Sequence, residues 1–154
     1  MIDTPKVTQV KEQLTAKIHL VVPREDIRTV MGPGIEEVRA AVAAQGIAVT
    51  GPWLTHHLRM DPKVFDFEIC VTVASPVSPT GRVEPGRLPG GKVAQTVFHG
   101  DYEGLGQAWG EFGAWIEKKG LTPAEDLWEV YRVDPGTDPN PSKWQTELNR
   151  PLKG

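Results

Sequence analysis

Glu129 and Tyr131 are the residues whose types and spacing could do chemistry. They lie in residues 127–133, a segment rich in aromatic and β-branched residues that is followed by an Asp-Pro pair. This composition predicts a β-strand that ends in a turn. Because side chains alternate along a strand, Glu129 and Tyr131 should share one face, and Trp128 should lie on the other as part of the core. We therefore expect a carboxylate beside a phenol on a largely apolar surface.

A carboxylate on an apolar surface requires an explanation, because burying an unpaired charge costs free energy. A structural salt bridge is one explanation for Glu129. The functional explanation is a pocket in which Glu129 attracts a cation through a low dielectric, with aromatic rings adding cation–π attraction. Glu129 could equally act as a general base toward water.

Three further residues are candidates for the same site as Glu129. Glu68 lies on the polar side of a predicted strand, where it could share acid and base duties with Glu129 or form a salt bridge. Tyr102 begins a predicted helix, where its ring could cover a cleft or simply pack. Trp53 could stack on a ligand. For Tyr131, hydrogen bonding to a ligand and core packing are both open.

Several other kinds of site find no support in the sequence. His56 and His57 are adjacent on a predicted strand, so they should point to opposite faces and make a poor metal site. Cys70 has no evident base partner and suits a small buried position. No Ser-His-Asp pattern, phosphate loop or dinucleotide fingerprint is present. We expect neither a metal nor a cofactor.

The overall composition is that of a globular domain. The 154 residues are 39% hydrophobic and 24% charged, with 17 basic and 20 acidic side chains. Because the net charge is −3 and no basic run is present, we expect no direct binding to nucleic acid. No apolar run is long enough for a membrane span, and no signal peptide is evident. With one cysteine, the chain fits the reducing cytoplasm.

The order of predicted elements indicates two similar halves. Strands are predicted at residues 16–22, 53–60, 63–74, 92–99, 127–133 and 144–151, and helices at 35–45 and 102–119. Residues 1–11 are a short strand or a loose arm. We expect the segment Gly32-Pro33-Gly34 to interrupt any helical turn that begins near residue 26. Residues 75–91, rich in proline and glycine, are predicted to be a surface crossover.

Matching landmarks recur at nearly constant separations along the chain. The predicted helix-capping glycines, Gly46 and Gly120, are 74 residues apart (120 − 46), and Trp53 and Trp128 are 75 apart (128 − 53). We therefore predict one α+β domain over residues 1–154, with duplicated strand-helix-strand-strand halves at about 12–75 and 91–152. They should form a mainly antiparallel sheet with both helices on one face and a ligand cleft between the halves.

Four segments in this order resemble the GyrI-like family, the effector-binding domain attached to AraC- and MerR-type bacterial transcription regulators. They are FDFEICV at residues 65–71, HGDY at 99–102, WEVY at 128–131 and TELNRP at 146–151. The resemblance covers residues 12–152 and implies two pseudo-symmetric halves around an aromatic ligand cleft. It also implies that the glutamate at position 129 meets lipophilic cations. The chain lacks a helix-turn-helix segment, so we expect a stand-alone member.

The resemblance leaves two functions open. The first is capture of a lipophilic small molecule, cationic or planar, by Glu129, Tyr131, Tyr102, Glu68 and Trp53. The second is hydrolysis of cyclopropane-bearing alkylating natural products, as in some stand-alone relatives, with Glu129, Glu68 and Tyr131 as catalytic residues. The partner is a small molecule in either case, and a homodimer or a regulator partner is also open.

Overall fold

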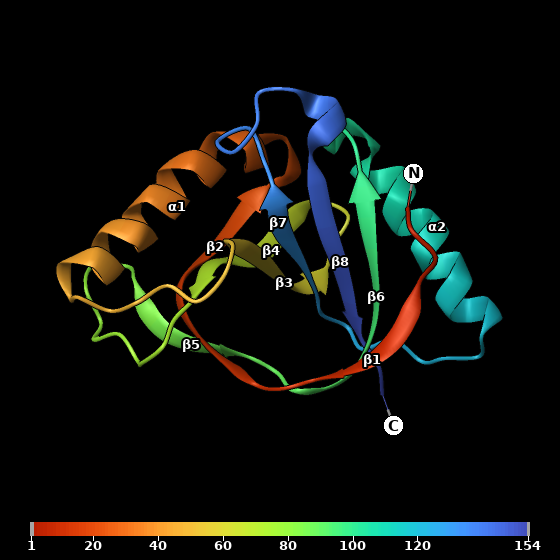
Figure 1. Cartoon of the computed structure of the whole chain (residues 1–154), viewed down its shortest axis with the longest axis horizontal. Helices are drawn as coiled ribbons and strands as arrows, with labels where there is room; N and C mark the ends of the chain where they lie inside the picture. The colour runs from red at the N-terminus through yellow and green to blue at the C-terminus, as the bar shows by residue number, and fades with distance from the viewer. Residues whose placement is uncertain (1, 154) are drawn as a thin grey trace. The chain divides into compact units, whose positions relative to one another are not determined.

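The computed structural model describes residues 2–153 and has an α+β fold, as predicted. The chain divides into two compact units. Unit 1 comprises residues 1–10 and 91–154, and unit 2 comprises residues 11–90. Within the described residues, each unit contains one α-helix and four strands that pair in antiparallel fashion (Figure 1).

Unit 2 is built on a sheet with the strand order β3-β4-β2-β5. Its elements are β2 (Gln13–Pro23), α1 (Ile27–Ala44), β3 (Leu54–Met60), β4 (Val64–Thr72) and β5 (Glu84–Leu88). Helix α1 packs on one face of β2 and β4, where apolar side chains alternate with polar ones along each strand. Ile18, Phe67 and Ile69 are fully buried in this core.

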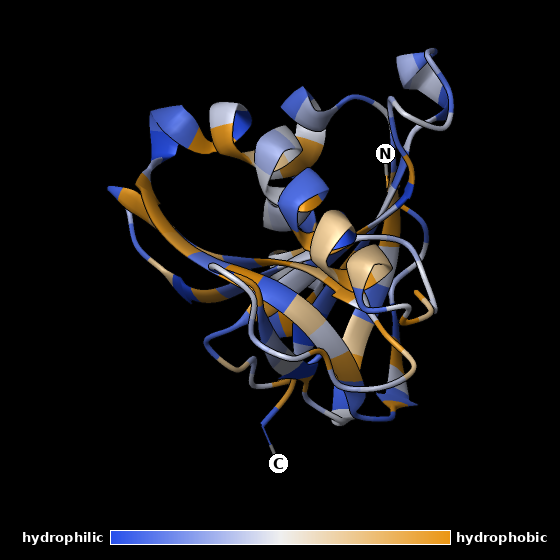
Figure 2. Ribbon diagram, turned by 90° about the vertical axis from the view of Figure 1, so that its left-hand side faces the viewer, coloured by the Kyte–Doolittle hydropathy of each residue, from blue (hydrophilic) through white to orange (hydrophobic). Residues whose placement is uncertain are grey.

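Unit 1 has the strand order β1-β6-β8-β7. Its elements are β1 (Lys6–Val10), β6 (Gly91–His99), α2 (Leu105–Lys118), β7 (Leu127–Val133) and β8 (Gln145–Pro151). An apolar stripe of α2 packs on this sheet: Phe112 and Ile116 are buried with Phe98 and Leu148. Hydrophobic and hydrophilic residues alternate along several of the strands drawn in Figure 2.

The prediction that Gly32-Pro33-Gly34 interrupts the first helix was wrong. Helix α1 continues through Pro33, because the apolar stripe that packs on the sheet begins before the proline and continues beyond it. Gly34 allows the helix to pack closely on β4, because a Cβ atom at this position would lie 2.4 Å from Ile69 Cδ1. The helix thus gives up one backbone hydrogen bond at Pro33 and keeps its contact with β4.

The crossover at residues 75–91 contains a strand that we did not predict. Strand β5 pairs with β2 at the edge of the sheet in unit 2. Pro85 is tolerated there because an edge strand need not donate on both sides. Gly86 lies against β2, where a Cβ atom would come within 2.8 Å of the Thr15 and Lys17 side chains.

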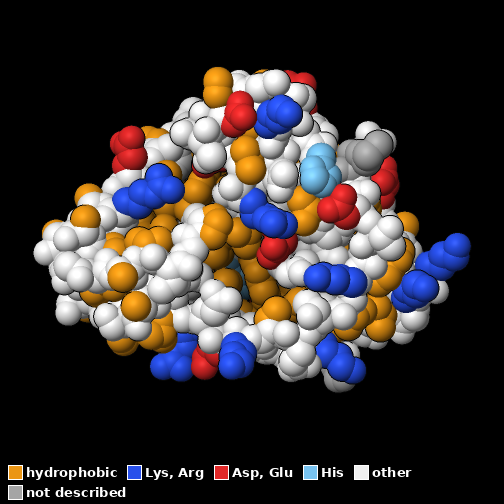
Figure 3. All heavy atoms as spheres, viewed as in Figure 1, with side chains coloured by type: hydrophobic (Ala, Val, Ile, Leu, Met, Phe, Trp, Pro, Cys, Tyr) orange, Lys and Arg blue, Asp and Glu red, His pale blue; other side chains and the backbone are white. Residues whose placement is uncertain are grey.

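Acidic and basic side chains are interspersed over the face of the molecule drawn in Figure 3, without a broad patch of one sign. Among residues 2–153, no helix has the length and hydrophobicity required to cross a membrane.

Candidate functional site

Glu129 is held by two neutral hydrogen-bond donors in unit 1. Its side chain lies on the face of β7 that is turned toward α2, because Glu129 is paired with the core residue Leu148 of β8. The Tyr131 hydroxyl donates to Oε1 at 2.8 Å, and Trp109 Nε1 of α2 donates to Oε2 at 2.7 Å. Glu129 is 9% exposed. The predicted face of Glu129 and Tyr131 is therefore confirmed.

The charge of Glu129 is not balanced by a basic side chain of the protein. Within residues 2–153, Glu129 takes part in no ion pair. Neutral donors compensate part of the lost hydration of a carboxylate, but they leave its net charge in place. The arrangement therefore retains a negative charge that a cation could approach.

Aromatic rings extend this arrangement away from the carboxylate. The rings of Tyr102 and Tyr131 meet edge to face with centroids 5.9 Å apart, and those of Tyr102 and Trp144 stack at 5.1 Å. Trp144 Nε1 donates to the Asp138 carbonyl oxygen at 2.8 Å, which fixes the indole. We call Tyr102, Trp109, Tyr131 and Trp144 the aromatic cluster. Its members come from the 3-10 turn before α2, from α2 itself, from β7 and from the residue before β8.

Local sequence explains why Tyr102 reaches this position. It begins a single 3-10 turn, Tyr102–Gly104, which Asp101 caps by accepting a hydrogen bond from the Glu103 backbone N–H at 2.9 Å. Gly104 packs so closely on β6 that a Cβ atom would lie 2.7 Å from the Phe98 ring. The turn is therefore fixed against the sheet, with the Tyr102 ring directed to the cluster.

The Tyr102 hydroxyl has no hydrogen-bond partner among the described residues, although its oxygen is buried. Burial, together with the nearby carboxylates of Asp134, Glu129 and Asp101, raises the pKa of Tyr102 well above its ordinary value. The hydroxyl is therefore protonated at physiological pH and can act as a donor.

Glu68 lies in unit 2, on the face of β4 opposite to the α1 core. Lys17 Nζ lies 2.7 Å from one carboxylate oxygen, and His56 Nδ1 lies 3.5 Å from the other. Burial opposes ionisation of Glu68, but the interactions with His56 and Lys17 outweigh it and keep the pKa of Glu68 below its ordinary value. Glu68 thus has the salt bridge that the sequence left open, and its functional role stays a prediction.

Trp53 packs against the hydrophobic core of unit 2, so a stacking role for this residue stays a prediction. Trp128 is paired with Asn149 and lies on the face of β7 opposite to Glu129, as alternation predicts. His56 faces Glu68, whereas His57 stacks on Phe67 at 5.3 Å on the other face of the sheet. Among residues 2–153, no cluster of His, Cys, Asp and Glu could hold a metal ion.

Comparison with protein families gives a match to the GyrI-like small molecule binding domain over residues 4–153. The chain belongs to the GyrI-like family. A comparison with curated proteins finds no match for this GyrI-like chain.

Solved structures share the fold of this GyrI-like chain at low sequence identity. The C-terminal domain of EcmrR superposes with a TM-score of 0.86 and 19% identity over 97% of both chains. In a complex of EcmrR with DNA, the match covers 99% of this chain but only 57% of EcmrR, so this chain spans little more than half of that protein. At this identity the similarity shows the fold alone.

Two further structures with this fold have descriptions that bear on chemistry. A protein from Listeria innocua described as a hydrolase has a TM-score of 0.69 and 16% identity, over 97% of this chain and 91% of its own. SAV2435 bound to tetraphenylphosphonium has a TM-score of 0.66 and 14% identity, over 99% of this chain and 95% of its own.

Trp109 and Trp144 are the members of the aromatic cluster that sequence reasoning missed. The helical spacing of Leu105, Trp109, Phe112 and Ile116 predicts only a core position for Trp109, and Trp144 is only the first residue of a predicted strand. The spacing of apolar residues along α2 predicts that Trp109 faces the sheet. It does not predict that the indole N–H of Trp109 donates to a carboxylate. Trp144 lies in an irregular loop, where neither a helical nor a strand period predicts side-chain direction.

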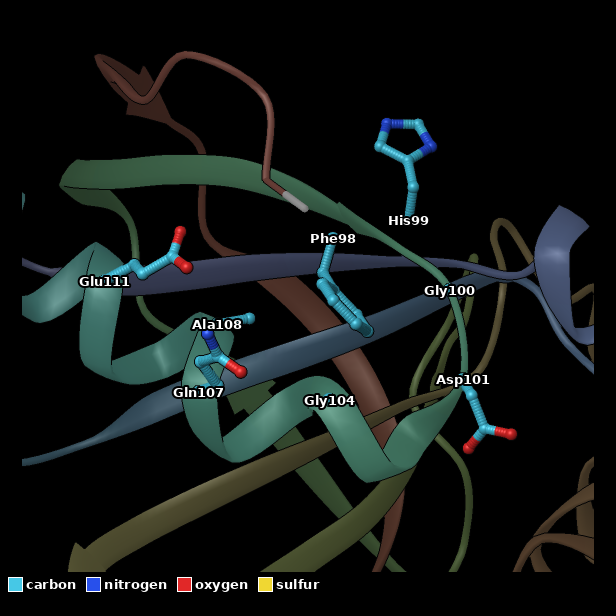
Figure 4. Close-up of a pocket in the computed structure, with 8 residues that line it drawn as sticks. All are labelled: Phe98, His99, Gly100, Asp101, Gly104, Gln107, Ala108 and Glu111. Carbon is cyan, nitrogen blue, oxygen red and sulfur yellow. The ribbon is translucent and has the colours of Figure 1, made fainter.

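A hollow of about 300 Å³ lies at the start of α2, next to the end of β6. It is lined by Phe98, His99, Gly100, Asp101, Gly104, Gln107, Ala108 and Glu111 (Figure 4). Two of its polar side chains already have partners: Asp101 caps the 3-10 turn, and His99 Nε2 lies 3.0 Å from Asp3. We assign no function to this hollow of the GyrI-like fold.

Proposed function

We propose that this GyrI-like domain binds lipophilic organic cations, including planar aromatic ones, at Glu129 and the aromatic cluster. The observation that carries the proposal is the state of the Glu129 carboxylate. It is buried and bound by two neutral donors, and no ion pair within the described residues offsets its charge.

The physical basis is the combination of a fixed charge with rings. A carboxylate attracts a cation more strongly where little water surrounds it. A ring face within about 6 Å of a cation adds roughly 0.5–2 kcal/mol. Because Tyr131 and Trp109 already orient the carboxylate, a ligand would not have to order it. The tetraphenylphosphonium complex of SAV2435 supports the choice of ligand class.

Isothermal titration with tetraphenylphosphonium tests the proposal through Glu129→Gln, which removes the charge and nearly preserves the shape. We expect at least a tenfold loss of affinity, about 1.4 kcal/mol. Glu147→Gln is the matched control, because Glu147 lies on the neighbouring strand β8 and binds Gln95 and Asn149 instead. This control should bind like the wild type. Equal affinity of the wild type and Glu129→Gln would refute the proposal.

Hydrolysis of a cyclopropane-bearing electrophile is a second candidate, favoured by a carboxylate that lies beside phenolic donors. Glu129 would accept a proton from water while the water oxygen bonds to a ring carbon. One C–C bond of the ring would break, and its electron pair would pass to the other carbon and take up a proton. Incubation with such a compound should then yield more than one equivalent of product with the added mass of one water. A stable protein adduct, or no product, would contradict this candidate.

A further inference from the structure

The Tyr102 hydroxyl is a buried donor that lacks an acceptor within residues 2–153. The chain has two tyrosines, and they differ in this respect: Tyr131 donates to Glu129 at 2.8 Å, whereas Tyr102 donates to no described group. A buried polar group without a partner costs free energy, so such groups in folded proteins usually meet a ligand, an ion or water.

Tyr102 lies beside the proposed cation site. Its ring meets that of Tyr131, whose hydroxyl is bonded to the Glu129 carboxylate. A molecule whose positive centre approaches Glu129 would therefore have its neighbouring atoms near Tyr102. The surrounding carboxylates of Asp134, Glu129 and Asp101 act on the phenol through space and keep it in its protonated form.

The ring of Tyr102 is stacked on that of Trp144, with centroids 5.1 Å apart. Tyr102 belongs to the 3-10 turn before α2, and Trp144 follows the short 3-10 helix Pro141–Lys143. Both rings are carried by segments that connect regular elements. Because the Tyr102 hydroxyl oxygen is buried, a ligand would have to displace neighbouring side chains to reach it.

We propose that Tyr102 donates a hydrogen bond to the bound ligand, so that the preferred ligands are aromatic cations with an oxygen or nitrogen acceptor near the cationic centre. This inference rests on the proposed function and narrows its ligand class. A ligand without the acceptor would leave the hydroxyl unpaired in a desolvated site, and it would bind correspondingly more weakly.

Matched probes can isolate this hydrogen bond. The triphenylphosphonium cations with one methoxyphenyl group carry an acceptor oxygen, and their ethylphenyl counterparts replace it with a methylene of similar size. Affinities of the ortho, meta and para pairs should be measured by titration calorimetry with the wild type, Tyr102→Phe and Tyr131→Phe. Tyr131→Phe is the control, because it deletes the hydroxyl that already has a partner.

For at least one ring position, the wild type should bind the methoxy compound about tenfold more tightly than the ethyl compound. Tyr102→Phe should abolish this preference, whereas Tyr131→Phe should retain it. Absence of a preference in the wild type, or its persistence in Tyr102→Phe, would overturn the inference. Either result would leave cation binding through Glu129 intact, since Glu129→Gln tests that separately.

Discussion

Glu68 and Glu129 are both buried carboxylates on strands, but the protein compensates them in different ways. Glu68 is 8% exposed and lies against a lysine ammonium and a histidine. Glu129 is 9% exposed and has two neutral donors. Lys17 balances the charge of Glu68 locally, and we expect this interaction to stabilise the fold. No ion pair within residues 2–153 balances the charge of Glu129, which is why we propose that a ligand binds there.

The Glu68 pair should make stability depend on pH. Because the pKa of Glu68 is lower in the folded protein than its ordinary value of 4.5, its contribution is present above about pH 4.5 and is lost as the pH falls through the folded value. We expect Glu68→Gln to lower the free energy of unfolding by about 1–3 kcal/mol at pH 7 and by progressively less below about pH 4.5. Urea denaturation across this range measures the effect.

Glu37→Gln is the control for Glu68→Gln. Glu37 forms an exposed ion pair with Arg82 at 2.8 Å, which should contribute less than about 1 kcal/mol. A loss for Glu68→Gln that is no larger than that of the control, or that does not change with pH, would show that the Lys17–Glu68 pair does not stabilise the fold.

Strand alternation was sufficient to place Glu129 with Tyr131 and to separate both from Trp128. It could not show that Trp109 is hydrogen-bonded to Glu129, because that contact joins a helix to a strand and depends on their packing. It also could not show that Lys17 pairs with Glu68, since 51 residues separate them in the chain. Local periodicity gives the direction of a side chain, whereas its partner depends on tertiary contacts.

At the scale of elements, helix α1 shows how packing overrides local preference. Proline and glycine in sequence predict a helix break, yet the helix continues because its buried face extends from before Pro33 to Val42. Sequence alone also gave no sign of β5, whose Pro85 and Gly86 resemble a loop. Only the pairing with β2 makes that segment a strand.

Alanine substitutions at Gly34 and Gly32 together test the contact between α1 and β4. Alanine normally stabilises a helix relative to glycine by roughly 0.5–1 kcal/mol, and Gly32→Ala should show this gain because nothing lies within 4 Å of its added Cβ. Gly34→Ala should instead destabilise by about 1–3 kcal/mol, since its Cβ would overlap the buried side chain of Ile69. Thermal and urea unfolding of both variants measure the difference. Similar stabilities of the two variants would show that close packing at Gly34 is unimportant.

At the scale of the whole molecule, the two units share more than the order of their elements. Gly46 and Gly120, which follow the two helices, have φ angles of 68° and 72° and are 74 residues apart (120 − 46). Strands β3 and β7 have register shifts after His57 and Tyr131, which are also 74 apart (131 − 57). The duplication predicted from the sequence stays a prediction, and these matched irregularities support it.

The correspondence gives unit 2 a counterpart of the Tyr102–Trp144 pair. His57 of β3 pairs with Phe67 of β4, and its equivalent Tyr131 of β7 pairs with Thr146 of β8. Equivalent residues of β4 and β8 are therefore 79 apart in the chain (146 − 67). By this offset, Phe65 corresponds to Trp144. Arg24 begins the 3-10 turn of unit 2 as Tyr102 begins that of unit 1. The Arg24 guanidinium lies 4.3 Å from the centre of the Phe65 ring. In unit 2, the Arg24 guanidinium thus lies on the Phe65 ring at the position where Tyr102 stacks on Trp144 in unit 1.

Binding at Glu129 can be observed most directly through the indole N–H groups. The chain has five tryptophans, and the Trp109 N–H is bonded to the Glu129 carboxylate at 2.7 Å. In ¹H–¹⁵N NMR spectra, saturation with tetraphenylphosphonium should shift the Trp109 indole signal, assigned with Trp109→Phe, more than that of Trp115, which packs at the edge of the same core. A complex that forms while the Trp109 signal stays unchanged would contradict the account.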